Sequence, residues 1–194
     1  MATASISNLT VGQAEMYFLD VVASTPGAAK AGNNPVTLGN ITAAEITPEI
    51  TYVEHYISVK GSRRKDRTVA TTKVINIPFT FDECSTANLS RFFLGDDTTG
   101  TRVIMLDKNE IQGRAILNFQ TNVGNNFIYV IPKCALRPDG GLAFSSDEWM
   151  TGNFMLEVQY HDTFTVLMGS PTATSAPYGY IAWDRTAIGS PFTV

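Results

Sequence analysis

Charged side chains, cysteines and long apolar runs are all scarce in this sequence. Only 16% of its 194 residues are charged, against a typical share of about 25%. Disorder does not follow from this scarcity, because 44% of the residues are hydrophobic and disordered chains have low apolar content and high charge. No apolar run reaches the ~18 residues that would cross a bilayer. The composition is typical of one folded domain with a substantial core, without a membrane span.

Basic residues are also in deficit. The 14 Lys and Arg face 18 Asp and Glu, which gives a net charge of −4, whereas dedicated DNA-binding domains usually have the opposite sign. Cys84 and Cys134 are far apart and have no partnering motif. A disulfide framework is therefore not expected, and a reduced cytosolic setting fits better. The first ten residues contain no Lys, Arg or apolar block, unlike a secretory signal.

The motifs of common enzyme classes are missing as well. The Gly-Lys-Ser/Thr of a phosphate-binding loop does not occur, and Gly-Ser-Pro at Gly169 and Gly189 is not a nucleophile elbow. The two histidines, His55 and His161, fall in expected strands without an assignable nucleophile. Two Cys and two His far apart lack the paired spacing of a structural zinc site. We therefore expect no catalytic residue, no cofactor and no metal.

Turn residues recur along the chain, with β-rich segments between them. The clearest alternation predicts a strand with one dry face. That face comprises Val69, Thr71, Ile75, Ile77, Phe79 and Phe81. Pro78 cannot donate a ladder hydrogen bond, so an edge or a bulge is expected there. Further strands are predicted at 15–22, 48–59, 102–106, 114–121, 127–132 and 152–161.

One short helix is predicted at 85–94. Ser85 is a good N-cap and Gly95 a C-terminal stop. Leu89, Phe92 and Phe93 fall at i, i+3 and i+4, so they are predicted to face the core and to hold the helix by tertiary packing.

About eight strands and one helix predict a mainly β domain over residues 1–168, an antiparallel β-sandwich or partly open barrel. Residues 169–194 are rich in Gly, Ser and Pro. We expect an extended C-terminal segment there, which packs through isolated aromatic side chains, with a neighbouring subunit as one candidate surface. These aromatics are Tyr178, Tyr180, Trp183 and Phe192.

The basic residues concentrate in one segment, which we expect to form a long loop at 60–72. Lys60 to Lys73 holds six of the 14 basic residues and one acid, so it carries +5 and leaves −9 for the rest of the chain. It could be a solvated hairpin tip, a nucleic-acid patch, or an arm that docks on an acidic surface of another copy. Base stacking would need interleaved aromatics, which are missing. Complementary patches on different faces of one molecule generate head-to-tail assembly.

A series of short motifs, in a fixed order over about residues 14–162, resembles a known family. The motifs are Leu38–Asn40, Ile46–Ile50, Lys65–Val69, Phe79–Glu83, Ala87–Leu89, Phe92–Gly95, Ile131–Pro138 and Glu148–Met150. In this order they resemble the major tail tube proteins of tailed bacteriophages, most closely those of long non-contractile tails.

The resemblance implies a β-sandwich or barrel-like fold flanked by a helix, shared with the tube protein of type VI secretion. It also implies a structural virion protein without enzymatic activity, assembled in the bacterial host cytoplasm. Its hexameric rings would stack into a tail tube through which genomic DNA passes, without specific binding, into the host. Tape measure, tail terminator and tail-tip proteins are implied as partners.

In that family the long loop between early strands reaches an adjacent ring. The resemblance therefore implies an inter-ring contact at the matching basic positions. These positions are Lys60, Arg63, Arg64, Lys65 and Arg67.

Three alternatives stay open. A tube subunit of a contractile tail or secretion system would share the fold, and a tail terminator would stop at a single ring. A carbohydrate-binding β-sandwich module, from a different class, would be a monomer with exposed aromatics. Its candidate residues are Tyr178, Tyr180 and Trp183.

Overall fold

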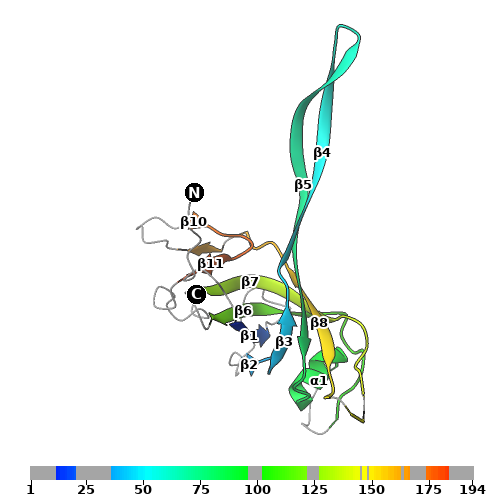
Figure 1. The fold of residues 1–194 in the computed structure, drawn as a ribbon, viewed down its shortest axis with the longest axis vertical. Coiled ribbons are helices and arrows are strands. Elements are labelled where there is room, and N and C mark those ends of the chain that lie inside the picture. Colours follow the sequence, from blue (N-terminus) through cyan, green and yellow to red (C-terminus); the bar gives the residue numbers. More distant parts are fainter. Residues whose placement is uncertain are drawn as a thin grey trace, which may run out of the picture.

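A computed structural model describes residues 12–20, 36–95, 102–121, 127–144, 146–147, 149–162, 164–166 and 174–183. These residues are mainly β, with one short helix, α1 (Thr86–Phe92), as the sequence predicted (Figure 1). The longer strands are β1 (Gly12–Asp20), β4 (Thr47–Val59), β5 (Ser62–Phe81), β6 (Ile111–Thr121), β7 (Phe127–Pro138) and β8 (Gly152–Val158). The shorter ones are β2 (Val36–Thr37), β3 (Ile41–Ala44), β9 (Thr165–Val166), β10 (Thr174–Ser175) and β11 (Tyr180–Ala182).

Six strands form the body of the molecule by pairing in an antiparallel circuit, β7-β6-β1-β3-β5-β8, which returns to β7. The circuit is uneven: β1 pairs with β6 along its whole length, but with β3 only at Ala14 and Ile41. The body is therefore a partly open barrel rather than a clean one. At the edges, β11 pairs with β7 and β4 pairs with β5.

The core lies inside this circuit and continues under α1. Ile77, Phe79 and Phe81 of β5 are buried, because alternate side chains of a strand point to the same face. The ring of Phe154 in β8 stacks on Phe81, with 4.7 Å between centroids. Phe92 of α1 packs edge-on against Phe154 at 5.7 Å, so the helix covers one end of the core.

The helix begins where its capping residue predicts. The Ser85 side chain accepts a hydrogen bond from the backbone N–H of Asn88, the usual role of an N-cap. Phe92 is buried, Phe93 packs partly against the core, and Leu89 is half-buried. The buried face of α1 thus consists of Asn88, Ser90, Arg91 and Phe92. Its polar members are held by hydrogen bonds and an ion pair.

The alternation expected from Val69 to Phe81 does not hold along the whole segment. Pairing of Thr51 with Thr72 and of Tyr52 with Ala70 leaves Thr71 as an extra residue in β5. Such a bulge shifts the alternation by one residue. As a result Val69 pairs with Val53 on the face opposite to Ile75 and is 52% exposed. The prediction of one dry face was therefore wrong from Val69 to Lys73, where every residue is exposed, and holds from Ile75 to Phe81.

Pro78 lies where the partner of β5 changes. Above it, Asn76 pairs with β4, and below it Phe79 pairs with β3. The Pro78 carbonyl accepts from the N–H of Glu45, between these two strands. The N–H and C=O of one strand residue point to the same side. The N–H that proline lacks would therefore point into the gap between β3 and β4, where no ladder hydrogen bond is lost. Pro78 is thus accommodated by a gap between β3 and β4, rather than at a sheet edge or a bulge, since its other side pairs with Met155 of β8.

The strand predicted at 102–106 was wrong, since this segment forms a turn around Met105 and Leu106. The backbone N–H of Leu106 donates to the Phe93 carbonyl at 2.8 Å, and that of Lys108 donates to Leu94 at 2.9 Å. The segment satisfies the carbonyls at the end of α1, which have no partner within the helix.

Within the C-terminal segment, residues 174–183 pack on the body. Tyr180, Ile181 and Ala182 pair with β7, and the Tyr129 hydroxyl donates to the Tyr178 carbonyl at 2.8 Å. Over residues 174–183 the aromatic side chains of this segment therefore contact their own chain. Phe192 and the ends of the segment lie outside the described residues.

Candidate interaction site: a projecting hairpin arm

Beyond the body, β4 and β5 continue as an isolated two-stranded ribbon, here called the arm (Pro48–Lys73; Figure 1). Every residue of the arm is exposed except Val59, which is half-buried. At about 3.3 Å per residue, Glu49 to Val59 extends about 35 Å. The expected long loop at 60–72 is corrected by this geometry, because the loop is only the turn at Lys60 and Gly61.

The turn has the geometry that two-residue hairpins favour. Lys60 and Gly61 both have positive φ, at 48° and 80°, and are flanked by the pair Val59 and Ser62. Turns with two positive φ values match the twist of the strands they join, and glycine adopts such values without strain. The basic run that follows therefore continues directly as strand β5.

Strand pairing divides the arm into two faces, because paired residues share a face. One, the tyrosine face, carries Ile50, Tyr52, Glu54, Tyr56, Arg63, Lys65 and Lys73. The other, the valine face, carries Glu49, Val53, His55, Ile57, Val59, Arg64, Arg67 and Val69. Asp66 is the extra residue of a second bulge between them.

On the tyrosine face Glu54, Tyr56, Arg63 and Lys65 interact with one another. Glu54 pairs with Lys65 and accepts a hydrogen bond of 2.5 Å from the Tyr56 hydroxyl. The guanidinium of Arg63 lies over the Tyr56 ring, 5.1 Å from its centroid. The hydrogen bond from Lys65, aided by that from Tyr56, lowers the pKa of Glu54, while the Glu54 carboxylate raises the pKa of Tyr56.

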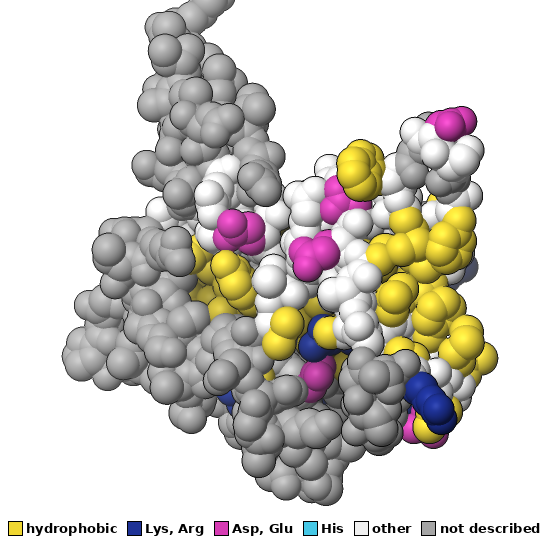
Figure 2. Space-filling model, turned by 90° about the horizontal axis from the view of Figure 1, so that it is seen from below, with side chains coloured by type: hydrophobic (Ala, Val, Ile, Leu, Met, Phe, Trp, Pro, Cys, Tyr) yellow, Lys and Arg dark blue, Asp and Glu magenta, His cyan; other side chains and the backbone are white. Residues whose placement is uncertain are grey.

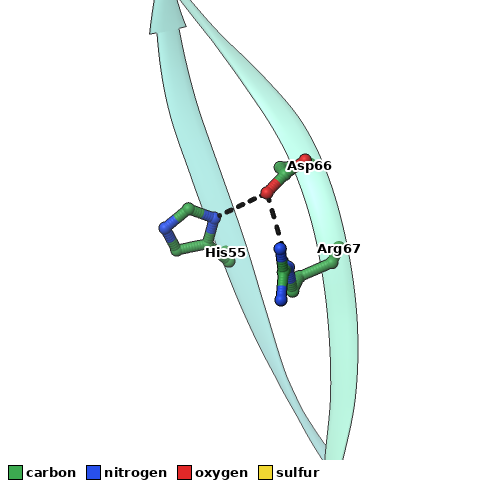
Figure 3. Close-up of polar contacts among 3 residues, drawn as sticks. All are labelled: His55, Asp66 and Arg67. Carbon is green, nitrogen blue, oxygen red and sulfur yellow. Dashed lines mark hydrogen bonds and ion pairs between the residues drawn. The ribbon is translucent and has the colours of Figure 1, made fainter.

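The valine face combines apolar side chains with positive charge that is only partly neutralised. Val53 and Ile57 are 56% and 43% exposed. Asp66 accepts from the His55 ring at 3.1 Å and lies 3.5 Å from Arg67 (Figure 3). Arg64 has no ion-pair partner in the part of the chain that the structure describes. This face therefore presents exposed apolar side chains beside a cation that has no ion-pair partner among the described residues.

Both edges of the arm are open as well. The outer edge of β4 has no partner strand among the described residues, and neither has the edge of β5 between Ser62 and Val74. Exposed edges present unpaired N–H and C=O groups to other chains. A two-stranded ribbon alone is marginally stable in water. The arm therefore has the physical features of a segment completed by another molecule.

A second exposed surface lies at the opposite end of the body. Figure 1 shows the arm at one end and α1 at the other. Figure 2, which views the α1 end, shows hydrophobic side chains gathered on the side where α1 and its neighbouring loops lie. We call this surface the end patch. The turn bonded to the end of α1 exposes Ile104 (59%), Met105 (58%) and Leu106 (75%). In the segment before β8, Phe144 (77%) and Trp149 (88%) are also largely exposed.

A groove of about 360 Å³ crosses the outer surface of β3, β5 and β8. Glu45 and Asp139 are the acidic groups in its lining, and the Thr80 hydroxyl donates to Asn153 there at 2.8 Å. The lining contains neither His nor Cys. Among the described residues, no cluster of three or more His, Cys, Asp or Glu is placed to bind a metal ion. Across the same residues, no helix is long and apolar enough to span a membrane.

The five basic residues named from the sequence all lie in the distal half of the arm, although on different faces. Arg63 and Lys65 are on the tyrosine face, Arg64 and Arg67 on the valine face, and Lys60 is in the turn. Sequence reasoning missed the exposed apolar residues of both faces and the whole end patch. A β-branched or aromatic side chain is normally predicted to be buried in the core. No local feature of the sequence indicated that these side chains are exposed.

Comparison with known proteins leaves the activity open. A family described as a protein of unknown function matches residues 21–109, which is 89 of the 194 residues. The match includes the whole arm and α1. No curated protein matches the chain.

Proposed function

We propose that the protein is the structural subunit of a phage tail tube, which polymerises as stacked hexameric rings that conduct the genome into the host. On this proposal it is a virion protein assembled in the bacterial cytoplasm, and it has no catalytic activity and no cofactor. It would meet the tape measure, terminator and tail-tip proteins in the tail. The single observation that carries the proposal is the arm, which exposes apolar side chains on both faces and hydrogen-bonding groups on both edges.

The arm supports assembly because it is costly for a solitary protein. Soluble monomers rarely expose extended apolar patches, and such patches usually mark interaction sites. An exposed ribbon edge invites pairing with other chains. Burial of the arm in permanent contacts between identical copies would remove both hazards, and interfaces of that kind often exceed ~2,000 Å².

Charge supports the same proposal. The arm holds six basic and three acidic residues, so it carries +3 and leaves eight basic and 15 acidic residues, or −7, for the rest of the chain. Opposite charge on arm and body favours contact between copies. An acidic lumen would also suit DNA passage, because a basic wall would hold phosphates through counterion release.

The carbohydrate-binding alternative is weakened by where its candidate aromatics lie. Tyr178 packs edge-on against Tyr160, with 5.7 Å between centroids, and Tyr180 stacks on Phe164 at 6.2 Å. Both rings are half-buried in their own chain. Of the three, Trp183 alone is largely exposed, at 66%, and it packs beside Phe127.

The test is the assembly state of the purified protein. We expect light scattering to show that the mean particle mass increases with protein concentration. We expect negative-stain microscopy to show hollow tubes. A variant with Arg63, Arg64, Lys65 and Arg67 all changed to Gln should keep its circular dichroism spectrum and form few tubes, because its arm has lost four positive charges. Single rings would point to a terminator instead. A monomer at all concentrations that binds glycans on an array would refute the proposal.

A further inference from the structure

We propose that the arm has two strand registers, which differ by one residue, and that two side-chain contacts hold it in the observed one. The contacts are those of His55 with Asp66 and of Glu54 with Lys65. Both contacts involve ionisable groups, so pH decides which basic side chains each face of the arm presents. The proposal concerns the arm of a single copy and does not rest on the tube function.

Burial does not fix the register of the distal arm. A slip of one residue moves the side chains of a strand to its other face, which burial of one face normally prevents. The distal arm is exposed on both faces, apart from the half-buried Val59. Its register must therefore be set by the turn and by contacts between side chains.

The bulge at Asp66 supplies the alternative register. In the observed register Tyr56 pairs with Lys65, and Asp66 is the extra residue. If Asp66 paired with Tyr56 instead, the extra residue would move into the turn, and the two-residue turn at Lys60 and Gly61 would become the three-residue loop 60–62. Three-residue loops are the next commonest connection in hairpins, but their last position has a positive φ that favours glycine. Serine occupies that position here, so the slipped register is the less populated one.

The slip would exchange the faces of three basic residues. Arg64, which lies opposite Ile57 on the valine face, would lie opposite Ser58 on the tyrosine face. Arg63 and Lys65 would move from the tyrosine face to the valine face. All three side chains are basic, so the slip moves charge between the faces without moving an apolar side chain of β5.

Two contacts exist only in the observed register, one on each face of the arm. On the valine face the Asp66 carboxylate lies 3.1 Å from the His55 ring nitrogen and 3.5 Å from Arg67 (Figure 3). On the tyrosine face Lys65 pairs with Glu54 across the bulge. In the slipped register Asp66 and Lys65 would each lie on the face opposite to these partners. The contacts therefore stabilise the observed register relative to the slipped one.

The two contacts respond to pH in opposite directions. A protonated His55 adds a charge–charge attraction to Asp66, which is full at low pH and is lost as the pH rises through about 5–8, where histidine side chains lose their charge. The hydrogen bond from Lys65, aided by that from Tyr56, lowers the pKa of Glu54 from its ordinary 4.5. The stabilisation by Glu54 is therefore present above that ordinary value and is lost as the pH falls through the lowered pKa.

No other element adds charge near these contacts, because the arm stands clear of the body (Figure 1). The remaining ionisable groups on its two faces belong to β4 and β5, and they are Glu49, Tyr52, Arg63, Arg64, Arg67 and Lys73. The observed register should accordingly be most populated near pH 5, between the two titrations.

Disulfide formation between opposed positions measures the register. In a Cys84→Ser background, with the fully buried Cys134 retained, one variant would carry Ser58→Cys with Arg63→Cys, and a second would carry Ser58→Cys with Arg64→Cys. The first pair is opposed in the observed register and the second in the slipped one. Effective concentrations of the two pairs would be measured in glutathione buffers, on protein too dilute to polymerise. Their ratio cancels the pH dependence of thiol chemistry.

We expect this ratio to favour the first pair and to be highest near pH 5. By pH 8 it should fall about two- to fivefold, the range that an exposed ion pair contributes, and it should also fall below pH 4. Asp66→Asn and His55→Gln should each lower the ratio at pH 5 and remove the fall above it. Glu49→Gln, at another acid on the valine face, is the matched control and should change neither.

A variant that lacks Asp66 has no extra residue, so its ratio should be high at every pH. The same pH profile in that variant, a ratio that does not change between pH 5 and 8, or a profile unaffected by Asp66→Asn would overturn the proposal. So would a second pair that forms no more disulfide than Ser58→Cys with Thr68→Cys, which are opposed in neither register. Because the measurement uses no assembled tubes, either result leaves the tube function to its own test.

Discussion

Asn88 is expected to be a major contributor to the stability of the body, and Asn88→Ala tests this. The side chain is 1% exposed. Its Nδ2 donates to the carbonyls of Leu38 and Glu83, each at 2.9 Å. These bonds join α1 to the segment before β3 and to the chain that enters the helix. The helix is only seven residues long, so such tertiary contacts must hold it in place.

The expected loss of unfolding free energy follows from the two carbonyls. Leu38 is fully buried, so its carbonyl would lose its partner without gaining water, at about 1–3 kcal/mol. Glu83 is exposed, and its carbonyl can be hydrated, so loss of that bond costs about 1 kcal/mol. The total is about 2–4 kcal/mol. Asn88→Asp should cost more, because it places a carboxylate against both carbonyls.

Urea unfolding of the charge-neutralised, assembly-deficient variant would measure these values at several pH values. Burial raises the folded-state pKa of a carboxyl, so the penalty of Asn88→Asp should be full at neutral pH and shrink as the pH falls through that raised pKa. Asn153→Ala, at an exposed acceptor for the Thr80 hydroxyl, is the control and should cost under about 1 kcal/mol. A loss below about 1 kcal/mol for Asn88→Ala would refute the reasoning.

Three further measurements test other parts of the structure. Phe92→Ala should cost about 3–5 kcal/mol in urea unfolding, because Phe92 is 5% exposed against the aromatic core; a change near zero would contradict its placement. Gly179→Ala should release β11 and speed hydrogen exchange in residues 180–182, since its Cβ would lie 2.0 Å from the Val130 carbonyl oxygen at a φ of 89°; unchanged exchange would count against this packing. By NMR titration the pKa of Glu54 should lie below its ordinary 4.5 and rise toward it in Lys65→Gln; an unmoved value would mean that Lys65 is not the cause.

Much of the body could be predicted because local chemistry and burial agree there. Ser85 caps α1 as its residue type predicts, and the alternation of Ile77, Phe79 and Phe81 is the inward face of β5. The same alternation failed at Val69, because the bulge at Thr71 inserts one residue. A bulge is set by the pairing of two strands, and neither strand shows it alone.

The arm could be predicted in part only. Its β-branched and aromatic residues indicated strand, but the charges from Lys60 to Arg67 indicated a loop. In the structure the charged segment is itself a strand. This is possible because a strand with only one neighbour in a two-stranded ribbon is exposed to solvent and can carry both charged and apolar side chains on either face. The sequence alone places the five basic residues in one segment, whereas their division between two faces required the register of β4 with β5.

Strand β5 connects the most protected and the least protected parts of the fold. It is 20 residues long. Its C-terminal part, up to Phe81, pairs with β3 and β8 and points alternate side chains into the core, whereas its N-terminal part, from Ser62 to Val74, pairs with β4 alone. A ribbon of two strands does not bury enough apolar surface to offset the entropy of ordering it. In the proposed tube, a neighbouring copy would supply the surface that β3 and β8 supply below. Ordering of the arm and growth of the tube would then be coupled, so each added copy would stabilise the arm of the one before it.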